Sequence, residues 1–411
     1  MSYNKQTSLA ANVEAIETAV KIHVQGRKAM AKEKETLSRY SGFGGIKEVL
    51  NIGTDNPLPD NMAEPMNRLQ KALRTLAGGE ETMYRKLTDS LKASVLTAFY
   101  TPQFLVDAVA RQIRAAFTEY GLPMRSLLEP SAGILPAALP DTRRYAFEKD
   151  CISGLILSLL HDDTTTVIDG FETIGGQDFG HTTFDVIASN IPFGDFRVFD
   201  ADLWKKGGIY ERSTKTIHTY FFVKAMEQLA EGGLLAFVTS RGVADTPGNK
   251  FVREYLVGHA DLISAIRLPD ALFLPTSGIE VGSDLLVFQK HTGKAALSLR
   301  EKMFLQSVRE KADATGIVTE PANRLFSLPK TYLAPDSRIV VNRYGKQVRK
   351  YQWLGDEAAM SQYLSALLRH DFARSFRKEL FSGGAGDTAP VQMSLFGMPA
   401  AGATRPDRGR R

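Results

Sequence analysis

Short apolar segments alternate with longer segments of helical periodicity through the middle of the chain. Five of the short segments are rich in β-branched, aromatic and leucine residues: 126–129, 144–148, 166–169, 184–189 and 234–240. This alternation predicts a mostly parallel sheet that is covered by helices on both faces. Two later apolar runs, 262–268 and 283–290, are expected to close the sheet as an antiparallel pair, with a loop at 269–282 between them.

The first 120 residues contain several stretches with the composition or periodicity of helices. Residues 9–34 and 62–97 are rich in good helix formers, and residues 103–120 repeat apolar side chains at helical spacing. Thr101 or its neighbour is expected to be the N-cap of the last of these helices, with Pro102 at the first helical position. Three glycines within residues 42–45 predict a turn, although a contact with a ligand stays open.

An acid or amide stands at the end of four predicted strands. These residues are Glu129, Glu148, Asp169 and Asn190. Any one of them alone is better explained as a helix cap or a solvated loop residue. Ligands of parallel α/β sheets bind at the carboxyl ends of the strands, so four such side chains favour a shared site.

The strand that ends at Asn190 runs directly into the turn Asn190-Ile191-Pro192-Phe193-Gly194. Pro192 fixes its own φ and has no N–H, so Asn190 and the neighbouring carbonyls are presented as hydrogen-bond acceptors. Phe193 offers a flat face for stacking. Two acceptors and a ring suit an exocyclic base amine whose lone pair is aimed at an electrophilic methyl group.

Composition limits the classes of function only weakly. The chain has 411 residues, of which 43% are hydrophobic, enough for a large α/β core with smaller additions. The 51 basic residues against 46 acidic ones lean toward a polyanionic partner without requiring one. A single cysteine, Cys151, excludes an internal disulfide. No apolar leader and no run of about 18 apolar residues is present, so we expect a cytoplasmic protein without a membrane span.

The C-terminal part has two kinds of segment. Residues 291–381 are mixed, with a basic cluster at Arg343, Lys346, Arg349 and Lys350 interleaved with aromatic residues. This pattern suits contacts with DNA, although a charged helix face explains it equally well. From residue 382 onward glycine, alanine, proline and serine increase, which predicts a disordered tail.

Five segments in the same order together resemble the N6-adenine DNA methyltransferases, in particular the methylase part of methylase–helicase proteins of mobile elements. The segments are Leu37-x-x-Tyr40-x-Gly42-Phe43-Gly44-Gly45, Phe99-Tyr100-Thr101-Pro102, Leu128-Glu129-Pro130-Ser131-Ala132-Gly133, Asn190-Ile191-Pro192-Phe193-Gly194 and Asp261-Leu262-Ile263-x-Ala265-Ile266-Arg267-Leu268-Pro269. The resemblance implies a doubly wound, Rossmann-like class I methyltransferase sheet, S-adenosyl-L-methionine as cofactor and double-stranded DNA as partner. We expect a helical N-terminal extension (1–95), a methyltransferase domain (96–292), a C-terminal α/β or DNA-contact region (293–381) and a disordered tail (382–411).

The resemblance also implies roles for particular residues. Tyr100, Thr101 and Pro102 would lie against the methionine end of the cofactor, and the turn from Glu129 through Pro130, Ser131 and Ala132 to Gly133 would pass beneath it. Glu148 would accept from the ribose hydroxyls, Asp169 or Glu172 would accept from the adenine amine, and Phe171 would pack on that ring. Asn190 and the Ile191 carbonyl in the Asn-Ile-Pro192-Phe turn would hold the target amine, and Phe193 would stack on an adenine flipped out of the duplex.

One departure from the family pattern leaves an alternative open. The loop reads Gly133-Ile134-Leu135-Pro136 where family members usually have a second glycine, and Leu135 is expected to crowd the cofactor. The alternative is a DNA-binding accessory protein of a mobile element that keeps the methylase fold without catalysis. Modification of a protein or RNA amide by the same chemistry is a third, weaker possibility.

The tail carries a further short motif. Gln392, Met393, Ser394, Leu395 and Phe396 resemble the peptide by which bacterial proteins dock on the replication sliding clamp. In that case Leu395 and Phe396 would fill an apolar pocket of the clamp. Alternatively, both side chains fold back onto the body of the protein.

Overall fold

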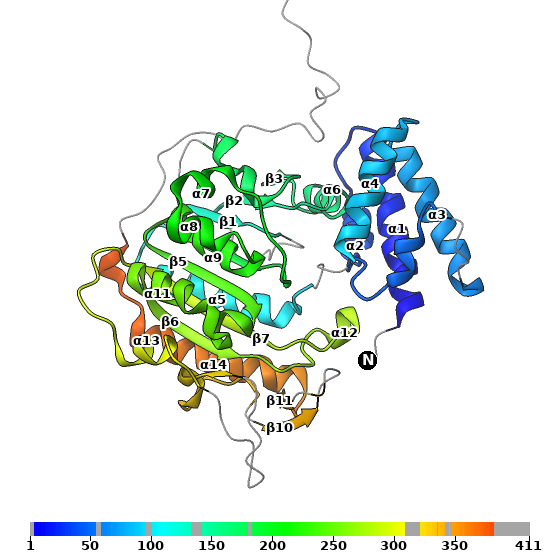
Figure 1. Cartoon of the computed structure of the whole chain (residues 1–411). Helices are drawn as coiled ribbons and strands as arrows, with labels where there is room; N and C mark the ends of the chain where they lie inside the picture. The colour runs from blue at the N-terminus through cyan, green and yellow to red at the C-terminus, as the bar shows by residue number, and fades with distance from the viewer. Residues whose placement is uncertain are drawn as a thin grey trace, which may run out of the picture.

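A seven-stranded sheet forms the centre of the computed structural model (Figure 1), which describes residues 4–54, 59–95, 100–132, 142–179, 183–308, 321–334, 336–341, 345 and 347–381. The strand order is β3-β2-β1-β4-β5-β7-β6. The strands are β1 (Ser126–Glu129), β2 (Arg143–Phe147), β3 (Thr164–Val167), β4 (Phe184–Asn190), β5 (Leu229–Ser240), β6 (Ala260–Arg267) and β7 (Ser283–Lys290).

The pairing confirms the predicted fold class. Strands β3, β2, β1, β4 and β5 pair in parallel, and β7 pairs antiparallel with both β5 and β6. The chain builds outward from β1 in one direction and then continues from β4 in the other. The gap between the carboxyl ends of β1 and β4 is therefore a topological switch point, where ligands of such sheets bind.

Helices cover both faces of the sheet, as the strand pattern predicted. On one face, α5 (Gln103–Glu119) and α14 (Glu357–Ser375) pack over Val186, Ile263 and other inward side chains. On the other face, α9 (Ile217–Gln228) and α11 (Lys250–His259) pack over Ile187 and its neighbours. Because successive strand residues point to opposite buried faces, the central strands read as continuous apolar runs.

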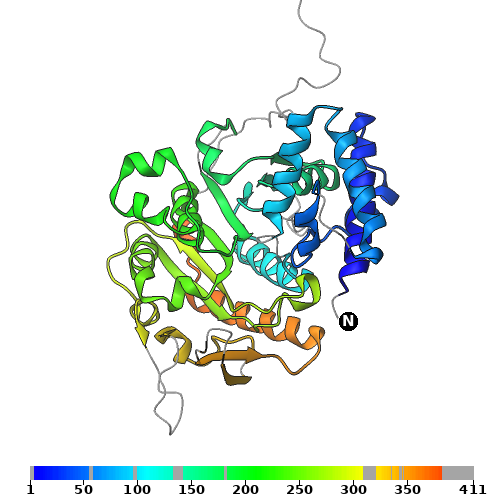
Figure 2. The same ribbon diagram turned by 45° about the vertical axis from the view of Figure 1, so that its right-hand side comes forward.

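The N-terminal helices form a separate layer beside the edge of the sheet (Figures 1 and 2). The stretch predicted as one leading helix contains two, α1 (Lys5–Val24) and α2 (Ala31–Leu37), with Gly26 at φ 60° between them. The second predicted stretch also contains two, α3 (Asp60–Leu76) and α4 (Glu81–Ser94). Their apolar side chains share one core with α6 (Cys151–Leu160), which follows β2. The glycine segment at 42–45 is a turn, as predicted.

The predicted start of α5 is displaced by one residue. Pro102 itself is the N-cap, and α5 begins at Gln103 without a side-chain cap. The φ of Pro102 is −55° and its ψ is 137°, so its backbone is extended. The expectation of Pro102 at the first helical position is therefore wrong, because the extended backbone of this segment continues one residue further.

The C-terminal region packs directly on the sheet. Helix α14 contacts β6 and α5, and the hairpin of β10 (Asp336–Val341) and β11 (Gln347–Gln352) lies beside it. Of the predicted basic and aromatic cluster, Arg349, Lys350, Tyr351 and Trp353 lie in or next to β11, whereas Arg343, Tyr344 and Lys346 lie outside the described residues. The remaining elements are α7 (Ala201–Lys206), α8 (Gly208–Ser213), α10 (Gly242–Asp245), α12 (Leu274–Ser277), α13 (Leu299–Phe304), β8 (Ser307–Val308), β9 (Ala322–Asn323) and five short 3-10 helices.

Within the described residues, no helix is both long and apolar enough to cross a membrane.

Candidate active site

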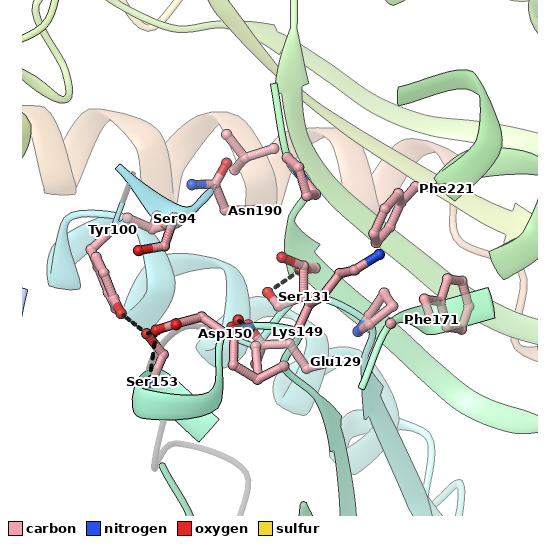
Figure 3. A pocket seen from close by; sticks show the side chains of 18 of the residues that line it. Ser94, Tyr100, Glu129, Ser131, Lys149, Asp150, Ser153, Phe171, Asn190 and Phe221 are labelled. Atoms are coloured by element: carbon pink, nitrogen blue, oxygen red, sulfur yellow. Dashed lines mark hydrogen bonds between the residues drawn. The ribbon is translucent and has the colours of Figure 1, made fainter. Parts of the chain in front are cut away.

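A cleft of about 1440 Å³ opens at the carboxyl ends of the parallel strands. Figure 3 shows side chains from β1, β4 and the start of α6 converging on it. The structure brings most of the sequence-predicted residues together along its wall: Tyr100, Thr101, Glu129, Pro130, Ser131, Ala132, Glu148, Asp169, Phe171, Glu172, Asn190, Pro192 and Phe193. Pro102 and Ile191 do not line the cleft. Gly133 and the rest of its loop lie outside the described residues.

Glu129 ends β1 and is buried at the bottom of the cleft. Burial raises the pKa of its carboxyl well above the ordinary value, and the nearby Glu148 raises it further. The two acids make this part of the cleft unfavourable for another anion. A cationic ligand would relieve the repulsion and favour the ionised form of Glu129.

Glu148 is the first residue after β2, and its backbone and side chain are both held. Its N–H donates to the Val167 carbonyl at 3.0 Å, which extends the pairing of β2 with β3. One carboxylate oxygen accepts from the Asp150 N–H at 2.8 Å. Asp150 is in turn the N-cap of α6 and accepts from the Ser153 N–H at 2.9 Å. The Glu148 carboxylate is thus fixed at the point where the cleft meets the start of α6.

The third strand contributes a more open group of residues. Strand β3 ends at Val167, two residues before the predicted end, so Asp169 lies in the following loop, where it accepts from the Gly170 N–H at 2.7 Å. Glu172 pairs with Lys149 at 2.9 Å across the cleft wall. A Cβ on Gly170 would lie 2.2 Å from a Glu172 carboxylate oxygen, so a larger residue there would displace the end of the Glu172 side chain.

Phe171 is less available than the sequence suggested. Its side chain is only 2% exposed, and its ring packs against Phe147 and Phe221 at centroid distances of 5.9 and 5.6 Å. Most of its surface therefore belongs to the core beneath the cleft, because the 3-10 helix at 171–176 turns the ring inward. Only a small part of the ring is left for a bound molecule.

Asn190 is the last residue of β4, at the switch point. The Ile191 N–H still donates to the Val238 carbonyl of β5 at 3.1 Å, so the pairing holds the turn in place beyond the strand end. The Ile191 side chain is buried in the core. The Phe193 ring meets Phe273 edge to face, with centroids 5.9 Å apart. The turn is therefore held from below by a strand hydrogen bond and at its end by an aromatic contact.

Sequence reasoning missed a hydroxyl network that joins the N-terminal helices to the cleft. The Ser153 hydroxyl donates to Asp150 at 2.6 Å, so its oxygen is left to accept from the hydroxyls of Tyr40 at 3.3 Å and Tyr100 at 3.2 Å. Ser90 of α4 donates to the other Asp150 oxygen at 2.9 Å. Burial is the main cause that raises the pKa of both tyrosines, so they remain protonated donors. Tyr40 lies in one of the family-like segments, and this was the only indication in the sequence that it belongs near the site.

Part of this chain is similar in sequence to known proteins. Residues 156–318 match the profile of the family N-6 DNA Methylase, a stretch that includes Asn190 and begins after Glu129 and Glu148. A segment of 204 residues, 49% of this chain, is 26% identical to Defense against restriction protein B of Escherichia phage P1. That segment covers only 9% of the phage protein.

Two solved structures are among those to which this chain is similar. A putative class I S-adenosylmethionine-dependent methyltransferase of Listeria monocytogenes is 14% identical, with a TM-score of 0.42 over 72% of this chain and 90% of that one. A type I restriction-modification methyltransferase subunit of Streptococcus thermophilus is 12% identical, with a TM-score of 0.40 over 70% of this chain and 78% of that one.

The match over residues 156–318 confirms the predicted resemblance to the N-6 DNA methylases and supports a methylase role. Members of that family use S-adenosylmethionine, in agreement with the predicted cofactor.

Proposed function

We propose that this chain, whose residues 156–318 match the N-6 DNA methylases, transfers a methyl group from S-adenosylmethionine to the N6 amine of adenine in DNA. The observation that carries the proposal is the single cleft in which the strand-end acids Glu129 and Glu148 meet the Asn190-Ile191-Pro192-Phe193 turn. The acids suit a cationic methyl donor, and the turn suits an amine.

The cleft fits the cofactor in size and charge. Sites for small ligands usually measure about 300–1,000 Å³, so about 1440 Å³ leaves room for a cofactor and an extruded nucleotide together. When bound, S-adenosylmethionine supplies an electrophilic methyl group on a positively charged sulfur. In this proposal Glu148 would accept from the ribose hydroxyls and Asp169 or Glu172 from the adenine amine, and Tyr100 and Thr101 would border the methionine end; all five residues line the cleft.

Asn190 and the Ile191 carbonyl would bind the target amine of an adenine that has left the duplex. By accepting hydrogen bonds from the two N–H groups of the amine, they would direct the nitrogen lone pair toward the methyl group. Phe193 would stack on the base and fix its plane. Positioning of this kind supplies a large part of the rate enhancement in a transfer between two bound groups.

The charge state of Glu129 makes a prediction for the variant Glu129→Gln. Between the ordinary carboxyl pKa and the raised one, the folded protein keeps a proton that the unfolded chain has released, so stability falls as the pH rises through this window. Glutamine removes the effect. We expect the thermal midpoint of the cofactor-free protein at pH 7 to rise by about 2 °C, and the affinity for S-adenosylmethionine to fall about tenfold.

Thermal unfolding and calorimetric titration between pH 6 and pH 8 measure both effects. In the wild type, affinity should increase as the pH approaches the raised pKa of Glu129, because binding favours the ionised carboxyl. The glutamine variant should lack this dependence. Glu35→Gln, on the exposed surface of α2, is the matched control and should change neither quantity. An unchanged cofactor affinity in Glu129→Gln would exclude Glu129 from the cofactor site.

Calorimetric titration of the wild-type protein with S-adenosylmethionine tests the first step of the proposal. Saturable binding with a dissociation constant in the micromolar range supports the enzyme. The alternative is an accessory protein without catalysis. It predicts no binding of S-adenosylmethionine to protein that is folded and free of carried-over cofactor. The loop at Gly133-Ile134-Leu135-Pro136, on which that alternative rests, lies outside the described residues.

The hairpin of β10 and β11 is the part of the C-terminal region that we propose to grip DNA. Arg338 and Lys350 face each other across its two strands, with Arg349 next to Lys350. The Arg241 guanidinium donates to the Arg349 carbonyl at 2.9 Å and pairs with Asp270, which ties the hairpin to the end of β5. A basic hairpin fixed beside the strand ends suits contacts with the phosphates of DNA.

We also propose that the segment Gln392-Met393-Ser394-Leu395-Phe396, which lies outside the described residues, docks on the replication sliding clamp. The double variant Leu395→Ala and Phe396→Ala should lose capture of purified clamp, because it removes the two apolar anchors. Met393→Ala, within the same segment, is the control and should retain capture. Unreduced binding by the double variant would exclude this mode of recruitment.

A further inference from the structure

Three exposed aromatic side chains follow the proposed catalytic turn. The exposed fractions of their side chains are 42% for Phe196, 73% for Phe199 and 51% for Trp204. Among the described residues, no other phenylalanine or tryptophan is exposed to this extent. We call residues 195–204 the aromatic arm. Large apolar side chains gathered in one exposed segment mark a surface that contacts a partner more often than chance exposure does.

The aromatic arm is held rigidly. Buried Asp200 forms an ion pair with Lys224 at 2.8 Å and accepts from the Tyr220 hydroxyl at 3.1 Å. Its other oxygen accepts from the N–H groups of Asp202 and Leu203 at 3.0 and 2.9 Å and caps α7. The arm therefore presents its rings from an anchored backbone, with little ordering required on binding.

Two further contacts orient the rings. The Val198 N–H donates to the Thr214 carbonyl at 2.9 Å, and the Trp204 indole N–H donates to the Thr214 hydroxyl at 3.2 Å. The Phe199 and Trp204 rings lie 6.0 Å apart at 49°. The Phe196 ring covers Gly194, where a Cβ would lie 2.5 Å from the ring. One side of each ring is supported, and much of the rest is open to solvent.

The aromatic arm is continuous with the cleft. Phe196, Arg197, Val198 and Phe199 line the same cavity as Asn190. Over residues 195–216, the exposed charged side chains are five basic (Arg197, Lys205, Lys206, Arg212, Lys215) and three acidic (Asp195, Asp202, Glu211). Exposed rings interleaved with basic groups at the edge of a nucleic-acid site suit stacked bases and their phosphates.

We propose that the aromatic arm is a stacking platform for unpaired nucleobases of the DNA that enters the cleft. Phe199 and Trp204 stack on bases next to the target, and Phe196 borders the target itself. This inference rests on the proposed function for its choice of DNA as the partner. Stacking outside the cleft would offset part of the loss of base pairing when the target adenine leaves the duplex.

Trp204 is itself a reporter, because the chain has only two tryptophans. Trp353→Phe leaves Trp204 as the only source of tryptophan fluorescence and retains an aromatic ring against Tyr363. The probes are a single-stranded 12-mer of thymidylate and an abasic 12-mer with the same number of phosphates. Neither contains adenine, and no cofactor is added, so the measurement does not depend on the target pocket or on methyl transfer.

In this single-tryptophan protein, we expect the thymidylate 12-mer to quench Trp204 fluorescence and to bind about tenfold more tightly than the abasic 12-mer. Phe199→Ala and Phe199→Leu should both reduce that preference, because leucine keeps the apolar bulk but lacks the aromatic face. Leu354→Ala is the control, at a 78% exposed side chain elsewhere. Circular dichroism confirms that each variant is folded.

Equal binding of the two 12-mers, or an undiminished preference in both Phe199 variants, would overturn the stacking platform. These outcomes are distinct from failure of the proposed function, which would appear as absent S-adenosylmethionine binding or absent methylation. A preference for bases in a protein that does not methylate DNA would leave the platform in place and remove only its catalytic purpose.

Discussion

Asn190→Ala is expected to reduce methyl transfer to DNA by at least about a thousandfold while the affinity for S-adenosylmethionine stays within about twofold. The reason is the position of Asn190 at the end of β4, where its amide oxygen and the Ile191 carbonyl are the two acceptors proposed for the target amine. Removing one acceptor leaves the amine free to rotate its lone pair away from the methyl group. The cofactor is proposed to be held by groups at the ends of β1, β2 and β3, which the variant leaves intact.

Transfer of a radioactive methyl group to DNA measures the first quantity, and calorimetry measures the second. Asn67→Ala, at an exposed position of α3, is the matched asparagine control and should retain full activity. Activity retained in Asn190→Ala would contradict the assignment of the turn as the catalytic element. Loss of cofactor affinity together with activity would instead indicate that Asn190 serves the cofactor.

The largest expected effect on stability is that of Arg267→Leu, at the end of β6. The side chain of Arg267 is 1% exposed and bonds to Asp284 at 2.9 Å and to Asp245 at 2.7 Å, with its guanidinium 3.9 Å from the centre of the Phe326 ring. Removing the arginine takes the hydrogen-bonded cation from the fully buried Asp284 and from Asp245, and leaves Arg241, which pairs with Asp270, as a nearby positive charge. Breaking such a pair typically costs about 3–5 kcal/mol in the free energy of unfolding.

Urea unfolding measures the loss. Arg68→Leu is the matched control, because Arg68 also contacts two carboxylates, Glu17 and Glu64, but its side chain is 41% exposed. Its replacement should cost no more than about 1 kcal/mol. If Arg267→Leu lowers the free energy of unfolding as little as the control does, solvent or a local rearrangement compensates the lost charge pairing of the two acids, and the prediction is wrong.

The sheet was predictable from the sequence because its strands are buried on both faces. The central strands β4, β5 and β7 are then largely apolar runs, and the strand ends at Glu129 and Asn190 follow from the same pattern. The edge strand β3 (Thr164–Val167) is three threonines and a valine and is only partly buried, so its end was predicted two residues too late. The antiparallel pairing of the last two strands was also predicted, and the pairing of β6 with β7 confirms it. Helix ends were less predictable. The breaks at Gly26 and near Gly78 depend on backbone conformations with positive φ that helical periodicity does not encode.

The missed parts of the site depend on contacts between distant segments. The N-terminal helices share a core with α6, and this packing brings Tyr40, Ser90 and Ser153 together. No local pattern of residues predicts that contact. The burial of Phe171 has the same origin, since Phe147 and Phe221 lie far from it in the sequence. The aromatic arm was visible as a sequence of Phe196-Arg197-Val198-Phe199, but its exposure required the fold.

The central claim is tested most directly by incubating the purified protein with DNA and S-adenosylmethionine that carries a deuterated methyl group. The DNA is then digested to nucleosides and analysed by mass spectrometry. We predict deuterated N6-methyladenine that increases with time and is absent with the Asn190→Ala variant. Deuterium on another base, or none in DNA after incubation with protein that binds the cofactor, would contradict the proposed reaction.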